Sequence, residues 1–194
     1  MATILLSSCA YKWGYGDRSL PGGYTKIAIP VFSNRSDFVG IEAAYTNALI
    51  HEFAKSKVAE VVKKKRSEVF IDAAIISVQV IHQGSRNINA GNVSDTVSGT
   101  DDAENEIRLP ENTVLTTEYR VVTNAKVYLR RTLDRKILWQ GTFFGERVYP
   151  APQVGLGVVN SVNPLYNHNA RINVIEGMSG DMMAEAHDRM TENF

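Results

Sequence analysis

The chain has 194 residues, 44% of them hydrophobic, which suits one compact domain with a single core. Its 21 lysine and arginine residues balance its 21 aspartate and glutamate residues, so the formal net charge is zero. This neutrality excludes a global field that would attract nucleic acid or an anionic surface, and any electrostatic function must be local. The single cysteine excludes an intramolecular disulfide and a metal site built from cysteines.

The amino terminus indicates attachment to a membrane through lipid. Residues 6–9 (Leu-Ser-Ser-Cys) have the residue types of a bacterial lipobox, which places an aliphatic and two small residues before the cysteine that receives lipid. We therefore expect lipidation at Cys9, with residues 1–24 as a lipobox remnant and a glycine- and aromatic-rich tether. The apolar run before this cysteine is short and follows no lysine or arginine, so a free cysteine is the alternative. No later segment approaches the ~20 apolar residues that span a bilayer, which leaves lipid as the expected attachment.

Residues 25–194 are predicted to form a single α/β domain that begins with a strand and a helix. Residues 26–32 are predicted to be a short buried strand, and Pro30 places it at a sheet edge or a strand end. From Gly40 the apolar residues recur at helical spacing, which predicts an amphipathic helix. Burial of its apolar stripe offsets the entropy of ordering only if a sheet covers it, so the helix is expected to pack on a sheet. The stripe consists of Ile41, Ala44, Tyr45, Ala48, Leu49 and Phe53.

Three further strands are predicted in the middle of the chain. Residues 69–81 are rich in isoleucine and valine, and residues 114–131 alternate between apolar and polar side chains. Residues 137–149 follow a polar connection and are the expected hairpin partner. The polar residues 83–113 have no apolar periodicity and are expected to form a long loop.

A second loop, rich in glycine, asparagine and proline, is expected before a helix over residues 169–193. We interpret the apolar stripe of this helix as core, although Gly177 and Gly180 weaken the prediction. The stripe consists of Ile172, Ile175, Met178, Met182, Ala186 and Met190. The order of elements predicts an α+β fold, an α/β sandwich in which two helices pack on one face of a mixed sheet of about four strands.

No catalytic or metal site is predicted. Residues 51–55 (His-Glu-Phe-Ala-Lys) begin like the HExxH zinc motif, but a protonated lysine stands where the second histidine ligand would be. The other histidines are far apart in the sequence, and a hydrolase would need a clustered nucleophile and base that the sequence does not display. The acidic residues 101–106 lack the spacing of an EF-hand, and residues 155–157 do not complete a phosphate loop. We therefore expect a protein that is not an enzyme and holds no metal or cofactor.

Basic residues gather in two groups. Residues 63–66 lie between two elements of a neutral protein without interleaved aromatics, so they are interpreted as a solvated turn, with an anionic envelope partner as the second interpretation. No nucleic-acid partner is expected. The denser group lies at the end of a predicted strand and in its connection, and consists of Arg130, Arg131, Arg135 and Lys136.

Several blocks of the sequence, spread over nearly its whole length, match one known family. The first block contains Cys9-Ala-Tyr, Leu20-Pro, residues 25–32 (Thr-Lys-Ile-Ala-Ile-Pro-Val-Phe), Asn34-Arg, Gly40-Ile-Glu and residues 46–49 (Thr-Asn-Ala-Leu). Residues 118–121 and 137–139 fit the family's two later strands, and the last helix falls where its terminal helix does. On these blocks the chain resembles the LptE family of lipopolysaccharide-assembly lipoproteins.

The resemblance implies an outer-membrane lipoprotein that faces the periplasm, with two helices against a four-stranded sheet. It also implies a partner, the β-barrel LptD. The protein would sit in this barrel as a plug, help to assemble it and assist the insertion of lipopolysaccharide into the outer leaflet. Residues 83–113 are longer than the family's connection, so contacts there cannot be carried over. The alternative function is a lipid-anchored regulator of a periplasmic cell-wall synthase, which could use a similar small domain on a lipid tether.

A role for the denser basic group follows from this resemblance. Lipopolysaccharide carries phosphates, and arginine offers a planar donor fork that matches them. We therefore expect Arg130, Arg131, Arg135 and Lys136 to contact lipopolysaccharide, with an ordinary charged hairpin end as the alternative.

Overall fold

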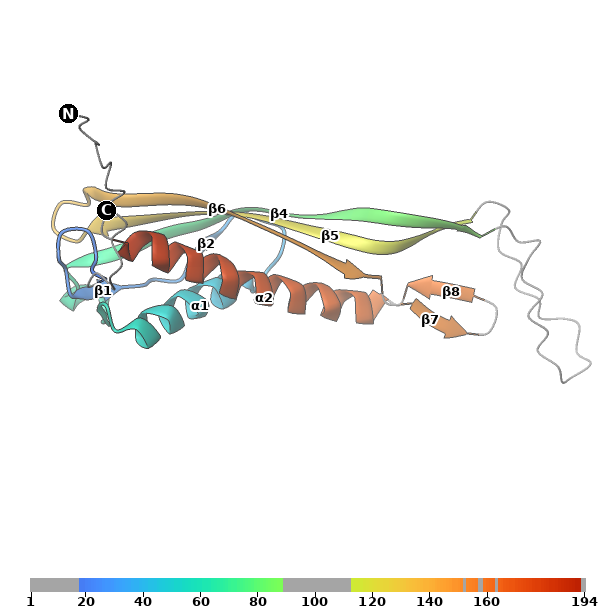
Figure 1. Ribbon diagram of the computed structural model, residues 1–194, viewed down its shortest axis with the longest axis horizontal. Coiled ribbons are helices and arrows are strands. Elements are labelled where there is room, and N and C mark those ends of the chain that lie inside the picture. Colours follow the sequence, from blue (N-terminus) through green and yellow to red (C-terminus); the bar gives the residue numbers. More distant parts are fainter. Residues whose placement is uncertain (1–17, 89–112, 152, 157–158, 163, 193–194) are drawn as a thin grey trace, which may run out of the picture.

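The computed structural model describes residues 18–88, 113–151, 153–156, 159–162 and 164–192. In these residues two helices lie on one face of a long, twisted sheet, and two short strands form a separate hairpin (Figure 1). The predicted α+β class is confirmed, although the mixed sheet has six strands instead of about four. The elements in chain order are β1 (Lys26–Ala28), β2 (Ser33–Asn34), α1 (Ile41–Ser56), β3 (Glu60–Val61), the short 3-10 helix η1 (Lys64–Arg66), β4 (Val69–Ile88), β5 (Thr113–Arg131), β6 (Ile137–Pro150), β7 (Gln153–Leu156), β8 (Val159–Val162) and α2 (Pro164–Thr191).

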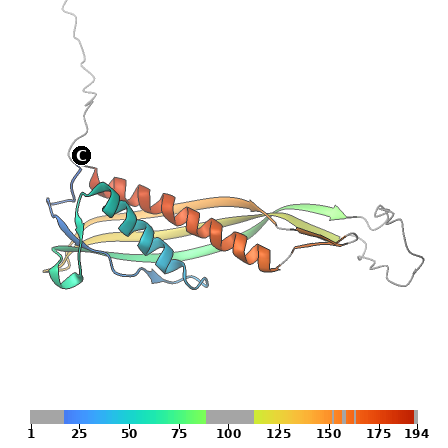
Figure 2. The ribbon, with the colours of Figure 1, turned by 90° about the horizontal axis from the view of Figure 1, so that it is seen from below.

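The sheet combines a parallel and an antiparallel part. Its strands follow the order β3-β1-β4-β5-β6, and β2 also pairs with β4. The pairs β1–β3, β1–β4 and β2–β4 are parallel, whereas β4–β5 and β5–β6 are antiparallel. Figure 2 shows α1 and α2 side by side across this sheet. The three long strands β4, β5 and β6 are therefore the frame on which the helices and short strands lie.

The segment predicted as one strand over residues 26–32 is divided into β1 and β2, and both pair with β4. Pro30, which has no N–H to donate to a neighbouring strand, lies in the interruption. Phe32 is buried, and its backbone N–H donates to Oγ1 of Thr46 on α1 at 3.1 Å. The buried N–H of Phe32 lies outside the strands, and its hydrogen-bond acceptor comes from the helix that packs against this segment.

The prediction of a loop over residues 83–113 is wrong at both ends of this range, where the chain forms strands. Strand β4 continues to Ile88, which lies opposite Thr113, the first residue of β5. Hydrogen bonds between the two backbones hold these polar residues in an extended conformation, and such bonds need no apolar stripe. Figure 1 shows this arm of the hairpin extending past the helices.

Part of the second predicted loop is also regular structure. Strands β7 and β8 form an antiparallel hairpin with Gln153 opposite Val162. Helix α2 then begins at Pro164, before the predicted start at residue 169. Proline suits the first turn of a helix because its missing N–H has no helical acceptor there and its φ is already helical. The prediction began later because it relied on the apolar stripe alone.

The core lies between the two helices and the sheet, as predicted. Burial raises the pKa of Tyr45 to about 12, and its hydroxyl donates to Sδ of Met182 on α2 at 3.4 Å. The interpretation of both stripes as core is confirmed at most of their residues, while Ala44, Ala48 and Ile172 are only partly buried. The buried stripe residues are Ile41, Tyr45, Leu49, Phe53, Ile175, Met178, Met182, Ala186 and Met190. Within the described ranges, no helix combines the length and the apolar content needed to cross a membrane.

Candidate functional site

The four cations predicted to contact lipopolysaccharide lie where β5 ends and turns into β6. Nε of Arg130 donates to Oδ2 of Asp72 on β4 at 2.8 Å. Nη1 of Arg131 lies 3.5 Å from Oδ2 of Asp134, which belongs to the turn itself. Both arginines therefore already have an anionic partner within the protein.

Arg135 and Lys136 differ from these two arginines. Both are exposed, and neither side chain forms an ion pair or hydrogen bond with any residue that the structure describes. Arg135 has a φ of 57°, and its backbone N–H donates to the carbonyl of Arg131 at 2.9 Å. The N–H of Lys136 donates to Oδ1 of Asp134 at 3.2 Å. Backbone contacts thus fix the turn and leave two side-chain charges available.

The second basic group, residues 63–66, lies beside this turn. The backbone N–H of Thr132 donates to the carbonyl of Glu68 at 2.9 Å, which joins the turn to the segment after η1. Nζ of Lys64 lies 4.4 Å from the centroid of the Phe70 ring on β4, a cation–π contact that holds η1 against the sheet.

Together, residues 63–66 and 130–136 form one surface, which we call the basic end. It lies at the end of the molecule where the carboxyl end of α2 and the first described residues are also found (Figures 1 and 2). The register that places Val69 opposite Arg131 brings the two groups together. The sequence pattern did not reveal this surface because it fixes neither the pairing nor the register of two distant strands.

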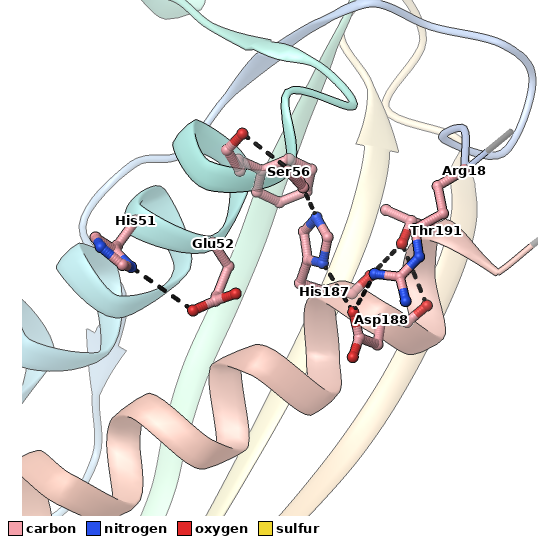
Figure 3. Close-up of polar contacts among 8 residues, drawn as sticks. Arg18, His51, Glu52, Ser56, His187, Asp188 and Thr191 are labelled. Carbon is pink, nitrogen blue, oxygen red and sulfur yellow. Dashed lines mark hydrogen bonds and ion pairs between the residues drawn. The ribbon is translucent and has the colours of Figure 1, made fainter. Parts of the chain in front are cut away.

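A polar cluster joins the carboxyl ends of the two helices (Figure 3). Nε2 of His187 lies 2.7 Å from Oγ of Ser56 on α1, and Nδ1 lies 3.2 Å from Oδ1 of Asp188. Asp188 also accepts a hydrogen bond from Nη1 of Arg18 at 2.7 Å. The ring of His187 is 1% exposed and packs edge-on against Phe53. No pattern in the sequence indicates this cluster, because only the packing of α1 on α2 brings the serine to the histidine.

Serine, histidine and aspartate are the residue types of a hydrolytic triad. If Nδ1–H donates to Asp188, Nε2 can accept a hydrogen bond from the hydroxyl of Ser56. Acyl transfer also needs N–H donors aimed at the oxyanion that develops. The first backbone N–H after the serine, that of Lys57, already donates to the carbonyl of Phe53 at 3.0 Å. The hydrogen bonds of this cluster therefore join α1, α2 and the segment at Arg18 to one another.

The other candidate residues do not form a site in the described part of the chain. His51 is an exposed helix residue whose Nδ1 lies 3.6 Å from Oε1 of Glu52. Within the described ranges, no three histidine, cysteine, aspartate or glutamate side chains are grouped so that they could hold a metal ion. Cys9, the acidic residues 101–106 and Gly157 lie outside the described residues.

The face of the sheet that points away from the helices carries a mixed surface, which we call the open face. Alternate residues of each strand point to it. Nε of Arg120 pairs with Oε1 of Glu146 there at 3.2 Å. The same row of the sheet contains Ile81 and Val148 on either side of Arg120, and both are exposed. Phe144, further along β6, is 58% exposed.

Comparison with known proteins identifies one family. A family model described as LptE, lipopolysaccharide-assembly, matches residues 24–191. No curated protein matches the chain in sequence.

Several solved structures resemble the chain at low sequence identity. A homolog of the neuraminyllactose-binding hemagglutinin from Helicobacter pylori has a TM-score of 0.49 and 8% identity, with 91% of this chain and 90% of that chain covered. The PelC dodecamer from Paraburkholderia phytofirmans has a TM-score of 0.48 and 8% identity, covering 87% and 90%. A minor lipoprotein from Acinetobacter baumannii has a TM-score of 0.45 and 9% identity, covering 87% and 93%.

Proposed function

We propose a role in lipopolysaccharide assembly for this chain, which belongs to the LptE (lipopolysaccharide-assembly) family. The observation that carries the proposal is the extent of the family match, because residues 24–191 include both helices and every strand. In this proposal the protein is a lipoprotein of the outer membrane, anchored at the periplasmic face by lipid on Cys9. Its role is binding and assembly, without a catalytic step.

The partner in this proposal is the LptD β-barrel. The chain would plug the barrel, help it to assemble and assist the insertion of lipopolysaccharide into the outer leaflet. The part of the open face around Arg120 supports such a contact, because the apolar residues Phe144 and Val148 are exposed there while Arg120 and Glu146 pair with each other. Another protein can cover this ion pair without leaving either of its two charges alone.

Affinity purification of the tagged chain from detergent-solubilised outer membranes is expected to recover a very large outer-membrane β-barrel. Phe144→Asp should lower the recovery of the barrel strongly, because it places an unpaired charge in the proposed contact. Val39→Asp is the matched control, since Val39 is also an exposed apolar residue but precedes α1 on the helix side. Recovery of an inner-membrane cell-wall synthase instead of the barrel would contradict the proposal and support the alternative regulator.

We also propose that lipopolysaccharide is contacted from the turn between β5 and β6. Of the four predicted cations, Arg135 and Lys136 are the two without a partner among the described residues, so they hold the available charge. The double reversal R135E/K136E should melt normally and co-purify with the barrel, while its affinity for lipopolysaccharide falls by roughly an order of magnitude or more. Binding by the wild type should weaken as salt is added.

The control for this double variant is Lys126→Glu, an exposed position on β5 five residues before Arg131. Its affinity for lipopolysaccharide, measured by titration of purified protein, is expected to equal that of the wild type. If R135E/K136E binds as tightly as the wild type, these residues belong to an ordinary solvated turn.

A further inference from the structure

We propose that the basic end docks on a phospholipid bilayer that carries anionic headgroups. The inference rests on the proposed lipid anchor at Cys9 and goes beyond it, because it gives the folded domain its own contact with the membrane. Three observations carry it: the unpaired charge of the basic end, an exposed apolar residue at its tip, and its position at the end of the molecule where the described residues begin.

The charge of the basic end is not balanced locally, although the chain as a whole is neutral. Asp72 and Asp134 pair with arginines, whereas Glu68, whose Oε2 accepts the backbone N–H of Thr25 at 3.0 Å, keeps its negative charge. The basic residues in 63–66 and 130–136 still outnumber these three carboxylates. Each basic residue close to an anionic bilayer strengthens binding about fivefold. At the basic end, the cations whose side chains have no polar partner among the described residues are Lys63, Lys65, Arg66, Arg135 and Lys136.

Leu133 adds an apolar tip to this charged surface. It is 90% exposed and lies in the turn between β5 and β6, between Thr132 and Asp134, with Arg131 and Arg135 two positions away on either side. Asp134 already pairs with Arg131. An apolar side chain in a turn that also carries cations suits the boundary between headgroups and acyl chains, because it can be buried there while the cations remain among the phosphates. Water satisfies only the charged part of this arrangement, and a neutral protein surface satisfies only its apolar part.

The position of the basic end agrees with a membrane contact. Arg18, the first described residue, is held at the carboxyl end of α2 by Asp188, and Glu68 at the basic end holds the backbone of Thr25. Cys9 lies nine positions before Arg18, so an extended chain between them reaches at most roughly 30 Å. A lipid on Cys9 would therefore keep this end of the molecule, and no other, close to the bilayer (Figures 1 and 2).

The test uses the full chain carrying Cys9→Ser, so that no acyl chain contributes to binding. Phosphatidylcholine vesicles with and without phosphatidylglycerol are titrated with the protein. The Cys9→Ser chain without further substitutions should bind the anionic vesicles in a salt-sensitive manner. It should not bind the neutral vesicles. K63Q/K65Q should lower the partition coefficient roughly 30-fold, about fivefold for each charge removed. The matched control R35Q/K126Q removes two exposed charges that lie outside the basic end and should leave the partition coefficient unchanged.

A second pair of variants tests the apolar tip. Leu133→Ser should weaken binding to anionic vesicles severalfold, whereas Val39→Ser, at an equally exposed apolar position beside α1, should not. Melting curves of these surface variants should match the wild type.

Three outcomes would overturn the proposal. These are equal binding to neutral and anionic vesicles, wild-type binding by K63Q/K65Q, and binding to purified lipopolysaccharide without binding to anionic vesicles, which would assign the basic end to lipopolysaccharide. Recovery of the barrel is measured on the same variants. If the Cys9→Ser chain with wild-type surface residues binds anionic vesicles but does not recover the barrel, the result counts against the proposed function and leaves the membrane contact standing.

Discussion

Replacing Leu49 by alanine is expected to lower the free energy of unfolding by about 2–5 kcal/mol. Leu49 is fully buried in the middle of the α1 stripe, between Tyr45 and Phe53, which are also fully buried. Shortening this side chain leaves a cavity that its neighbours cannot fill without giving up their own contacts with the sheet and α2. The cost therefore includes both the lost transfer free energy and the cavity.

Asn47→Ala, on the exposed side of the same helix, is the control and should change the free energy of unfolding by no more than about 0.5 kcal/mol. Urea denaturation of both variants measures the difference, provided that the slope of the transition stays constant. A midpoint for Leu49→Ala that equals the wild type would mean that this face of α1 is a partner surface instead of core.

The hairpin and the first helix could be predicted because their side-chain periods are strong. Alternation over residues 114–131 and 137–149 located β5 and β6 to within one residue at each end. The helical stripe that begins at Ile41 located the first residue of α1. In these elements one face is buried along most of the length, so the pattern of apolar residues reports the structure directly.

Other elements have no such pattern. Residues 83–88 and the β7–β8 hairpin are strands because a neighbouring backbone pairs with them, and pairing of this kind depends on the whole topology. The division of the first strand was only partly foreseen. Pro30 indicated an edge or an end, but the sequence could not show that the chain would resume pairing with β4 at Ser33.

The glycines illustrate how a weak helix signal can have a packing reason. A Cβ on Gly177 of α2 would lie 2.7 Å from Nη1 of Arg147, whose guanidinium donates to Asp181 one turn further along the helix. A Cβ on Gly145 of β6 would lie 2.6 Å from Sδ of Met182. Helix α2 and β6 therefore approach each other closely at these positions, and the helix continues through Gly177 because tertiary packing outweighs its low propensity.

The residue types of the candidate site could be predicted from the sequence, but the extent of the site could not. The sequence identified Arg130 to Lys136 as a dense basic group, but it could not show which charges the fold neutralises. Asp72, which pairs with Arg130, comes from a different strand. The same long-range pairing places residues 63–66 beside the group and so changes an apparently solvated turn into one half of the basic end.

Replacing Cys9 by alanine is expected to move the protein that is not bound to the barrel from the membrane to the soluble periplasmic fraction. One acyl chain alone binds a bilayer only marginally, with an association constant of about 10⁴ M⁻¹, whereas two chains anchor stably. A diacylated Cys9 would therefore supply most of the attachment. The basic end acts only within a Debye length of the surface, about 8 Å at physiological salt, so without the anchor it should retain at most a small, salt-sensitive fraction.

Ser7→Ala is the matched control, because it keeps a small residue in the lipobox and should leave the protein in the membrane fraction. Fractionation is combined with metabolic labelling by a fatty-acid probe, which separates lipid attachment from attachment through a partner. A wild type that remains unlabelled would remove the anchor from the proposal. If Cys9→Ala stays membrane-bound at high salt and is still recovered with the barrel, the attachment comes from the barrel, since a contact made by the basic end would be lost under those conditions.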